Sequence, residues 1–322
     1  MLEKKWDVVI IGGGPSGYTS AIYTSRATLS TLVLGGTSAG GQLMNTTDVE
    51  NFPGFPNGIK GPDLMIGMQQ QAQRFGTEIR FENVTKVDFS EETKKIWLGE
   101  NLIEAKAVIV STGASTKMLG IGEEKFMGRG VSPCAVCDAA FFRDKSAVVV
   151  GGGDAAMEDA MALTKYANQV YLIHRKSEFR ASKIMQDRVL VNQKIKVVWL
   201  SEVAGVYGEN KLEGIKVKNV ETGETRDLAT DGLFLAIGHN PTTEMFNNIL
   251  ELDDKGFLKT GITNGTRDVW IEGYPTMTSV EGVFGCGDVV DFRYKQAITA
   301  AGMGCQAALD VEKFLTGKTS SY

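Results

Sequence analysis

Two cysteines at close spacing are the most reactive feature of this chain. Cys134 and Cys137 are separated by two residues, and Asp138 follows directly. Cysteines at this spacing commonly have lowered thiol pKa values and exchange between dithiol and disulfide. A carboxyl beside them can pass a proton to or from a departing thiolate, provided that burial raises its pKa. The sequence therefore predicts a redox dithiol with Asp138 as its acid, the alternative for Asp138 being a turn or cap residue.

Zinc binding is the competing interpretation of the cysteine pair. A structural zinc site needs two more cysteine or histidine ligands at suitable spacing. The remaining candidates fall in no metal-binding pattern: Cys286, Cys305, His174 and His239. We therefore predict no metal site, and we interpret Cys286 and Cys305 as packing residues.

Two glycine-rich turns could each bind a nucleotide. They follow the apolar runs 8–11 and 147–150 and open the helix-like stretches 18–27 and 157–167. A further apolar run follows each stretch, which is the strand–helix–strand order of dinucleotide sites, although either turn alone could be a plain strand–helix connection. Such glycines permit a tight turn and close approach to a pyrophosphate, which the helix N-terminus favours. The candidate residues are Gly12, Gly14, Pro15 and Gly17 in the first turn and Gly151, Gly153 and Asp154 in the second.

The end of the second strand distinguishes the two turns. A ribose-binding acid usually stands there, about 20 residues beyond the glycines. The first motif instead has Gly35 and Gly36, and the second has basic residues. A guanidinium can hold a 2′-phosphate through paired charge-assisted hydrogen bonds, which favours NADP over NAD. A solvated basic strand end is the alternative for this group, which comprises His174, Arg175, Lys176 and Arg180.

Repeated strand–turn patterns predict the domain organisation. Residues 108–113 and 233–238 share one pattern, an apolar strand that ends in a turn of small residues, which indicates two similar units. The tail after Gly238 adds another strand and turn and a helix expected over 297–315, and it is too short for a third domain. We therefore expect the tail to complete the first unit, with the second unit inserted.

The predicted fold is α/β, with two Rossmann-like, three-layer ββα nucleotide-binding domains and a two-stranded hinge. The expected boundaries give a first domain of residues 1–114 plus 248–322 and a second domain of residues 115–247 that carries the dithiol. The chain of 322 residues is long enough for two cores. A rigid pair of lobes is the alternative to a hinged pair.

Composition excludes several function classes. The hydrophobic content of 43% and the charged content of 23% are ordinary for a soluble globular protein. A net charge of −5 does not suggest a nucleic-acid surface, and no apolar run is long enough to span a membrane. Four cysteines do not suggest a structural disulfide framework in a reducing compartment. We expect a cytoplasmic protein that binds neither nucleic acid nor membrane.

The two turns and the dithiol together predict an electron path. Nicotinamide carries hydride, whereas disulfide reduction needs an intermediary that accepts hydride and reduces sulfur, which is flavin chemistry. The first turn should therefore hold FAD and the second NADPH. Because the chain has one dithiol, the same sulfurs must meet the flavin and then a partner disulfide. We hypothesise that the inserted domain moves as a body to allow both encounters.

Further motifs extend along nearly the whole chain. They are Gly12-Gly13-Gly14-Pro15, Gly40-Gly41-Gln42-Leu43, Glu50-Asn51-Phe52-Pro53-Gly54-Phe55, Cys134-Ala135-Val136-Cys137-Asp138, Gly151-Gly152-Gly153-Asp154, His174-Arg175 with Phe179-Arg180, Gly287-Asp288 and Gln296-Ala297-Ile298. In these motifs the chain resembles the low-molecular-weight thioredoxin reductases. The resemblance implies an FAD-dependent homodimer that uses NADPH to reduce thioredoxin.

The resemblance also implies residue roles. Cys137 would lie nearer the flavin, Cys134 would attack thioredoxin, and Asp138 would be the acid. Arg175, Lys176 and Arg180 would hold the 2′-phosphate. Asp288 would hold the ribityl-phosphate region of the flavin. The other expected FAD-site residues are Gly41, Gln42, Asn51, Gly113, Gly287, Gln296, Ala297 and Ile298.

The chain departs from the family pattern at four positions. Lys176 stands where a second arginine is common, so NADPH affinity or selectivity is expected to be weaker. Pro133 precedes the dithiol and donates no hydrogen bond, so the setting of the dithiol is expected to differ. Ala139 replaces a common glycine, and Lys295 replaces a common arginine. None of these departures removes a catalytic atom.

Rival functions remain open on the sequence. A dithiol oxidase that uses oxygen, or a reductase fed by ferredoxin, is disfavoured by the second turn and its basic cluster. A reductase directed to glutaredoxin or peroxiredoxin differs only in its partner surface. A non-catalytic redox sensor or scaffold is disfavoured by the retained dithiol and Asp138, and a ferredoxin–NADP reductase of similar fold would lack the dithiol.

Overall fold

The computed structural model describes residues 5–37, 39–45, 48–261 and 273–317. The chain forms two compact units: a first unit of residues 1–115 and 240–322 and a second unit of residues 116–239. The boundary expected after residue 247 therefore falls earlier in the chain. The reason is Phe246, which is fully buried in the core of the first unit and stacks on Phe89 with ring centroids 6.4 Å apart.

A parallel sheet forms the centre of the first unit. Its strands lie in the order β5-β2-β1-β8, with β19 beside β8. The long strand β8 pairs through its first half with the antiparallel hairpin strand β7 and through its second half with β19. The bounds are β1 Trp6–Ile11, β2 Thr31–Leu34, β5 Glu78–Arg80, β6 Lys86–Asp88, β7 Lys94–Leu98, β8 Asn101–Val110 and β19 Val283–Gly285.

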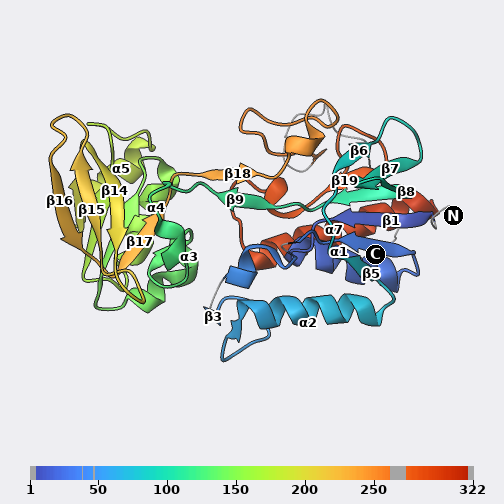
Figure 1. Cartoon of the computed structure of the whole chain (residues 1–322), viewed down its shortest axis with the longest axis horizontal. Coiled ribbons are helices and arrows are strands. Elements are labelled where there is room, and N and C mark those ends of the chain that lie inside the picture. The colour runs from blue at the N-terminus through green and yellow to red at the C-terminus, as the bar shows by residue number, and fades with distance from the viewer. Residues whose placement is uncertain (1–4, 38, 46–47, 262–272, 318–322) are drawn as a thin grey trace. The chain divides into compact units, whose positions relative to one another are not determined.

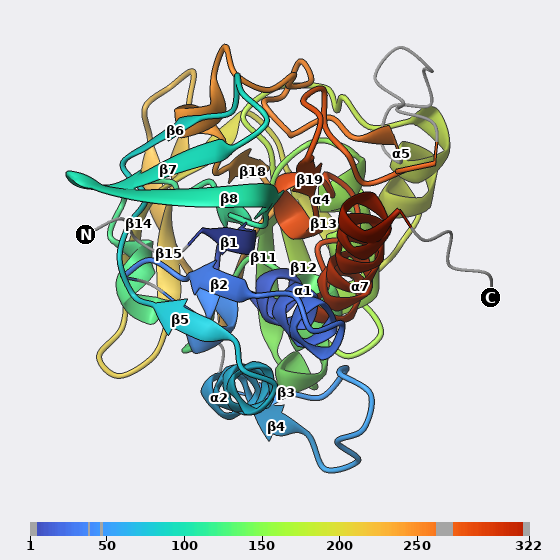
Figure 2. The ribbon, with the colours of Figure 1, turned by 90° about the vertical axis from the view of Figure 1, so that its right-hand side faces the viewer.

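Alternation along these strands gives the sheet two buried faces. Val8 and Ile10 face helices α1 (Pro15–Arg26), α2 (Gly61–Arg74) and α7 (Ala297–Thr316). Val9 and Ile11 face the β6–β7 hairpin and the segment 245–258. Helices α1 and α7 lie side by side (Figure 2). The smaller elements are η1 Gly41–Asn45, β3 Asp48–Val49, β4 Ile59–Lys60, η4 Glu244–Phe246 and η6 Gly287–Val289.

The second unit repeats this layering. Its five parallel strands lie in the order β10-β17-β11-β12-β13, helices α3, α4 and α5 cover one face, and a three-stranded antiparallel sheet covers the other. The bounds are η2 Glu123–Phe126, β10 Val131–Ser132, α3 Ala135–Asp138, η3 Ala139–Phe142, β11 Ser146–Val150, α4 Asp154–Leu163, β12 Gln169–Ile173, α5 Lys183–Leu190, β13 Ile195–Val198, β14 Ser201–Tyr207, β15 Gly214–Asn219, β16 Thr225–Ala229 and β17 Gly232–Leu235. The predicted class of two Rossmann-like ββα units is confirmed.

The chain passes between the units twice. The first passage is β9 (Ala114–Thr116) and the return is β18 (His239–Pro241), and the two strands pair with each other (Figure 1). Neither unit contains a helix, within the described residues, that is long and apolar enough to cross a membrane.

Candidate functional site

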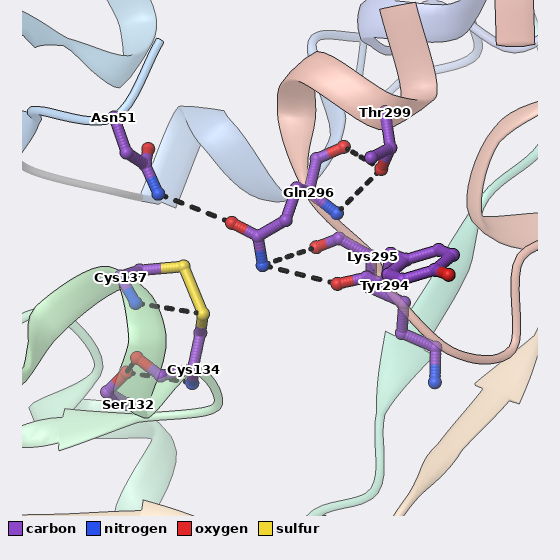
Figure 3. The surroundings of a disulfide bond; sticks show 8 residues. All are labelled: Asn51, Ser132, Cys134, Cys137, Tyr294, Lys295, Gln296 and Thr299. Atoms are coloured by element: carbon purple, nitrogen blue, oxygen red, sulfur yellow. Dashed lines mark hydrogen bonds between the residues drawn. A yellow bond between two sulfur atoms is a disulfide. The ribbon is translucent and has the colours of Figure 1, made fainter. Parts of the chain in front are cut away.

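A disulfide joins Cys134 and Cys137, whose Cα atoms lie 5.4 Å apart (Figure 3). The four-residue helix α3 creates this spacing, and its turn closes through a hydrogen bond from the Asp138 N–H to the Cys134 carbonyl (3.2 Å). The Cys137 N–H also donates to the Cys134 sulfur (3.2 Å). The Ser132 hydroxyl, at the end of β10, accepts the Cys134 N–H (3.0 Å). Both cysteines are thus held at the carboxyl end of a parallel strand.

The short dithiol helix has one buried and one exposed side. Ala135 and Ala139 are buried in the core of the second unit, whereas the Val136 side chain is 67% exposed. Burial raises the pKa of Asp138, and a hydrogen bond with Ser132 lowers it in part. A carboxyl with a raised pKa can hold a proton beside the sulfurs, as the sequence reasoning required.

The other two cysteines are free thiols. Cys286 is fully buried, its sulfur lies 3.7 Å from the Ser20 hydroxyl, and burial raises its pKa to about 12. Cys305 is half-buried in α7. A thiol with so high a pKa carries almost no thiolate near neutral pH, which makes Cys286 unreactive.

The first glycine turn is tightly packed at Gly12 and Gly17 and open at Gly14. Gly12 follows β1 with φ 120°, and a Cβ there would lie 2.2 Å from the Ser111 carbonyl oxygen. A Cβ on Gly17 would lie 2.1 Å from the Gly12 carbonyl oxygen. A Cβ on Gly14, by contrast, would meet no described atom within 4 Å. Gly14 caps α1 without a side-chain hydrogen bond, and Pro15 opens the helix. The space beside Gly14, at the N-terminus of α1, is therefore open.

The second turn has the same construction. A Cβ on Gly151 would lie 2.5 Å from the Ala236 carbonyl oxygen, whereas one on Gly153 would meet no described atom within 4 Å. Gly153 caps α4 without a side-chain hydrogen bond. The Asp154 carboxylate accepts hydrogen bonds from the Ser182 N–H (2.9 Å) and hydroxyl (2.7 Å), which lower its pKa. Asp154 thus connects the second glycine turn to the loop after β12, which carries Arg175, Lys176 and Arg180.

His174 differs from the basic residues around it. Its side chain is 7% exposed, a Cβ on Gly152 would lie 2.2 Å from its ring, and its Nε2 lies 2.9 Å from the Glu178 carbonyl oxygen. The Phe179 ring packs beside it with centroids 5.4 Å apart. Burial lowers the pKa of His174, and Arg180 and Arg175 add to this effect. His174 therefore packs against Gly152 of the second glycine turn, and its ring is largely neutral.

The other basic residues reach solvent. Arg175, Lys176 and Arg180 are exposed on the loop after β12. The Arg180 N–H donates to the Gly152 carbonyl (2.8 Å), which fixes this loop beside the second turn. Three cations therefore stand at the strand end where a ribose-binding acid would stand in an NAD site.

A set of amides lies at the start of α7 in the first unit (Figure 3). The Asn51 Nδ2 donates to the Gln296 Oε1 (3.3 Å), and the Gln296 Nε2 donates to the Tyr294 carbonyl (3.2 Å). Gln296 and Thr299 form a capping box at the α7 N-terminus. Ala297 is half-buried and Ile298 exposed in the first turn of this helix.

The remaining expected residues lie on loops of the same unit. Gln42, in η1 directly after Gly41, donates through its Nε2 to the Ala114 carbonyl. Gly113 has φ 72°, and its carbonyl accepts the Thr242 N–H (3.0 Å).

Asp288 is the most perturbed carboxyl among the described residues of the first unit. Burial raises its pKa to about 6, the Asp291 charge raises it further, and Lys295 opposes both. Its carboxylate accepts no hydrogen bond from the residues that the structure describes. Gly287 lies close to α1, because a Cβ there would lie 2.4 Å from the Ser16 hydroxyl. Asp288 is thus a half-buried acceptor that a ligand hydroxyl could satisfy.

Residues 6–304 match the family model of the pyridine nucleotide-disulphide oxidoreductases. The chain is 51% identical to the thioredoxin reductase of Streptomyces clavuligerus, over 98% of this chain and 95% of that protein. It is also 51% identical to thioredoxin reductase 2 of Arabidopsis thaliana, over 98% of this chain and 83% of that protein. This chain belongs to the thioredoxin reductase family. The resemblance found in the sequence is therefore confirmed.

Solved structures agree with this assignment. The thioredoxin reductase of Streptococcus pyogenes has a TM-score of 0.87 at 38% identity, covering 98% of this chain and 99% of that one. That of Giardia duodenalis has a TM-score of 0.87 at 40% identity, covering 97% and 99%. Membership of this family implies the use of a flavin and a pyridine nucleotide.

Sequence reasoning missed several residues that build the sites of this family member. Ser111 and Ser16 contact the glycines of the first unit, and Ser182 binds Asp154. The Asp291 carboxylate accepts the N–H groups of Arg293, Tyr294 and Lys295 and so shapes the loop before α7. Asp291 had a sequence signal, because aspartate side chains in turns commonly bond to backbone N–H groups two residues on, and Ser182 had one as a serine directly before α5.

Proposed function

We propose that this chain is an NADPH-dependent thioredoxin-disulfide reductase that uses FAD and the Cys134–Cys137 pair. The observation that carries the proposal is the disulfide itself, held at the end of β10 with Asp138 beside it. The names of the relatives support thioredoxin as the partner disulfide. The basic loop beside the second glycine turn supports NADPH as the donor.

The first unit is the proposed FAD site. The pyrophosphate would lie in the open space beside Gly14, where the backbone amides at the N-terminus of α1 would bind it. Asp288 would accept a hydroxyl of the ligand. Gln42, Asn51 and the first turn of α7 would flank the isoalloxazine. Bound FAD would supply the chemistry that links hydride transfer to disulfide reduction, which no side chain provides.

The second unit is the proposed NADPH site. The backbone amides at the N-terminus of α4, which Gly153 caps, would hold the pyrophosphate. Arg175, Lys176 and Arg180 would hold the 2′-phosphate. We assign His174 and Asp154 to support of the turn and loop, since both side chains are engaged within the protein.

The reduced dithiol is proposed to act by thiol–disulfide exchange. The Cys134 thiolate attacks one sulfur of oxidised thioredoxin and forms a mixed disulfide, and one thioredoxin cysteine leaves as a thiolate. Cys137 then attacks the Cys134 sulfur, which restores the disulfide and releases the second thioredoxin cysteine. Asp138 holds a proton within reach of the dithiol and passes it to a departing thiolate.

Several further properties belong to this proposal. The paired strands β9 and β18 would serve as the hinge on which the second unit moves between flavin and thioredoxin. The enzyme would be a homodimer and would act in the cytoplasm, where thiols are kept reduced.

A steady-state assay tests the proposed function. We expect NADPH oxidation by the FAD-loaded protein to depend on oxidised thioredoxin and to be much slower with NADH. Oxidation of NADPH by oxygen alone, with no dependence on thioredoxin, would contradict the proposal. A dependence on glutaredoxin or peroxiredoxin instead would keep the reductase and replace the partner.

A further inference from the structure

Three aromatic rings pack together at the basic loop, which comprises residues 174–180 after β12. The centroid of the Trp199 ring lies 4.2 Å from that of Phe179 and 6.2 Å from that of His174. Phe179 and His174 are buried, whereas Trp199 is half-buried. Trp199 stands in the turn between β13 and β14, so its ring reaches the basic loop from a separate segment of the second unit.

The turn that carries Trp199 is also joined to the basic loop through the backbone. The Ser201 N–H donates to the His174 carbonyl (3.1 Å), and the Leu200 N–H donates to the Lys176 carbonyl (3.4 Å). Leu200 has a left-handed backbone with φ 50°, which is rare for a bulky residue. The turn and the loop are therefore held together by ring packing and by two backbone hydrogen bonds.

These contacts fall on or directly beside the cations of the basic loop. His174 precedes Arg175, Phe179 precedes Arg180, and Lys176 is bonded through its own carbonyl. The side chains of the three cations make no hydrogen bond or ion pair with the residues that the structure describes. Their placement therefore depends on the backbone of the loop, and that backbone rests against the turn of Trp199.

We propose that Trp199 is a positioning residue for NADPH selectivity: its ring holds the basic loop in the shape that presents the three cations to the 2′-phosphate. The proposal rests on the proposed function, in which this loop binds the 2′-phosphate. Trp199 acts through Phe179 and His174 rather than through contact with the nucleotide. Because a guanidinium bonds to a phosphate in a fixed planar geometry, a displaced loop backbone weakens the paired hydrogen bonds.

Nucleotide binding by full-length, FAD-loaded variants tests this proposal. Trp199→Ala removes the ring, and Trp199→Phe keeps an aromatic contact with Phe179. Tyr207→Ala, which removes a ring from β14 on the antiparallel sheet of the same unit, is the matched control. Calorimetric titration with adenosine 2′,5′-bisphosphate measures binding of the 2′-phosphate without turnover. Steady-state assays with NADPH and with NADH give kcat and KM for each nucleotide.

We expect Trp199→Ala to weaken binding of the bisphosphate and to raise the KM for NADPH, each by about five- to tenfold. The kcat at saturating NADPH and the KM for NADH should stay the same, because the loop contacts only the 2′-phosphate. Trp199→Phe should recover most of the loss, and Tyr207→Ala should show none. Unchanged binding of the bisphosphate in Trp199→Ala, or an equal rise in the KM for NADH, would overturn the proposal.

Two further results keep the test decisive. If Trp199→Ala does not fold with FAD, Trp199→Leu, which keeps apolar volume without an aromatic ring, is judged by the same criteria. The parent enzyme distinguishes this proposal from the proposed function. Equal KM values for NADPH and NADH in the parent, with no binding of the bisphosphate, would remove the 2′-phosphate site and this proposal with it. Tight binding by the parent that Trp199→Ala retains would overturn this proposal alone.

Discussion

Each unit places a cysteine and an aspartate just after the same strand of its sheet. The strand orders β10-β17-β11-β12-β13 and β19-β8-β1-β2-β5 correspond, so β10 is the counterpart of β19. After β10 come Cys134 and, four residues later, Asp138, and after β19 come Cys286 and Asp288. Both aspartates have a raised pKa, chiefly through burial. Under the proposed function, Cys134 and Asp138 nevertheless take part in sulfur chemistry, whereas Asp288 holds a ligand.

Cys134 and Cys286 differ in their access to solvent and in whether a second cysteine lies nearby. Cys286 lies in the sheet core with a pKa of about 12, and no second cysteine stands nearby in the sequence. Cys134 begins a one-turn helix that has an exposed side and that brings Cys137 within disulfide distance. The position after a parallel strand supplies a place for a functional residue, and the local turn decides its chemistry.

Substitution of the cysteines should give the largest difference in turnover between the two units. We expect Cys134→Ser and Cys137→Ser each to lower thioredoxin turnover by about 10³-fold or more, because the two sulfurs act as a unit. Cys286→Ala should keep turnover within about threefold, since a buried thiol near pKa 12 takes no part in exchange. Turnover assays on FAD-loaded variants measure both effects. A comparable loss in Cys286→Ala would refute the distinction.

The open glycines should separate the two nucleotide sites. A Cβ at Gly14 or Gly153 would meet no described atom within 4 Å, so Gly14→Ala and Gly153→Ala should fold normally and instead obstruct a ligand. We expect Gly14→Ala to weaken FAD binding, and Gly153→Ala to retain FAD and weaken NADPH binding, each by about 10- to 100-fold. Flavin content and NADPH titration measure these effects. Loss of FAD in Gly153→Ala would contradict the assignment of the two units.

The basic loop should set nucleotide preference in the second unit alone. We expect Arg175→Ala and Arg180→Ala to raise the KM for NADPH by about tenfold, because each removes a charge-assisted contact to the 2′-phosphate. The KM for NADH, which lacks this phosphate, should stay the same. Asp187→Asn, on the exposed side of α5, is the control. Equal effects on both nucleotides would mean that these residues do not read the 2′-phosphate.

The smallest effect concerns stability at Asp288. Because its pKa in the folded protein is raised to about 6, the folded state holds the proton more tightly than the unfolded chain. The resulting stability is present below about pH 4 and is lost as the pH rises through 6. We expect Asp288→Asn to raise the free energy of unfolding of the flavin-free protein by about 1 kcal/mol at pH 8 and by less at pH 5. Urea unfolding at both pH values measures this, and an equal change at both would argue against a titrating Asp288.

Much of this architecture could be predicted from local pattern. The glycine turns, the strands before them and the helix over 297–315 recur in the structure, because tight turns and continuous apolar strands leave strong signals. The second domain boundary was wrong, since the burial of Phe246 depends on Phe89, which is remote in the sequence. Sequence motifs also could not show which side chains of one loop point into the protein and which point to solvent.

The basic loop shows this last limit clearly. His174 and Arg175 are adjacent, and both were expected at the nucleotide. The histidine ring packs beneath Gly152, whereas the arginine is exposed.

Anaerobic titration of the FAD-loaded protein tests the central claim most directly, namely that electrons pass from NADPH through the flavin to one dithiol. We predict that NADPH bleaches the flavin absorbance in the wild-type protein and in Cys134→Ser, and that oxidised thioredoxin restores it only in the wild-type protein. Failure of NADPH to bleach either protein, or restoration by thioredoxin in Cys134→Ser, would contradict the account.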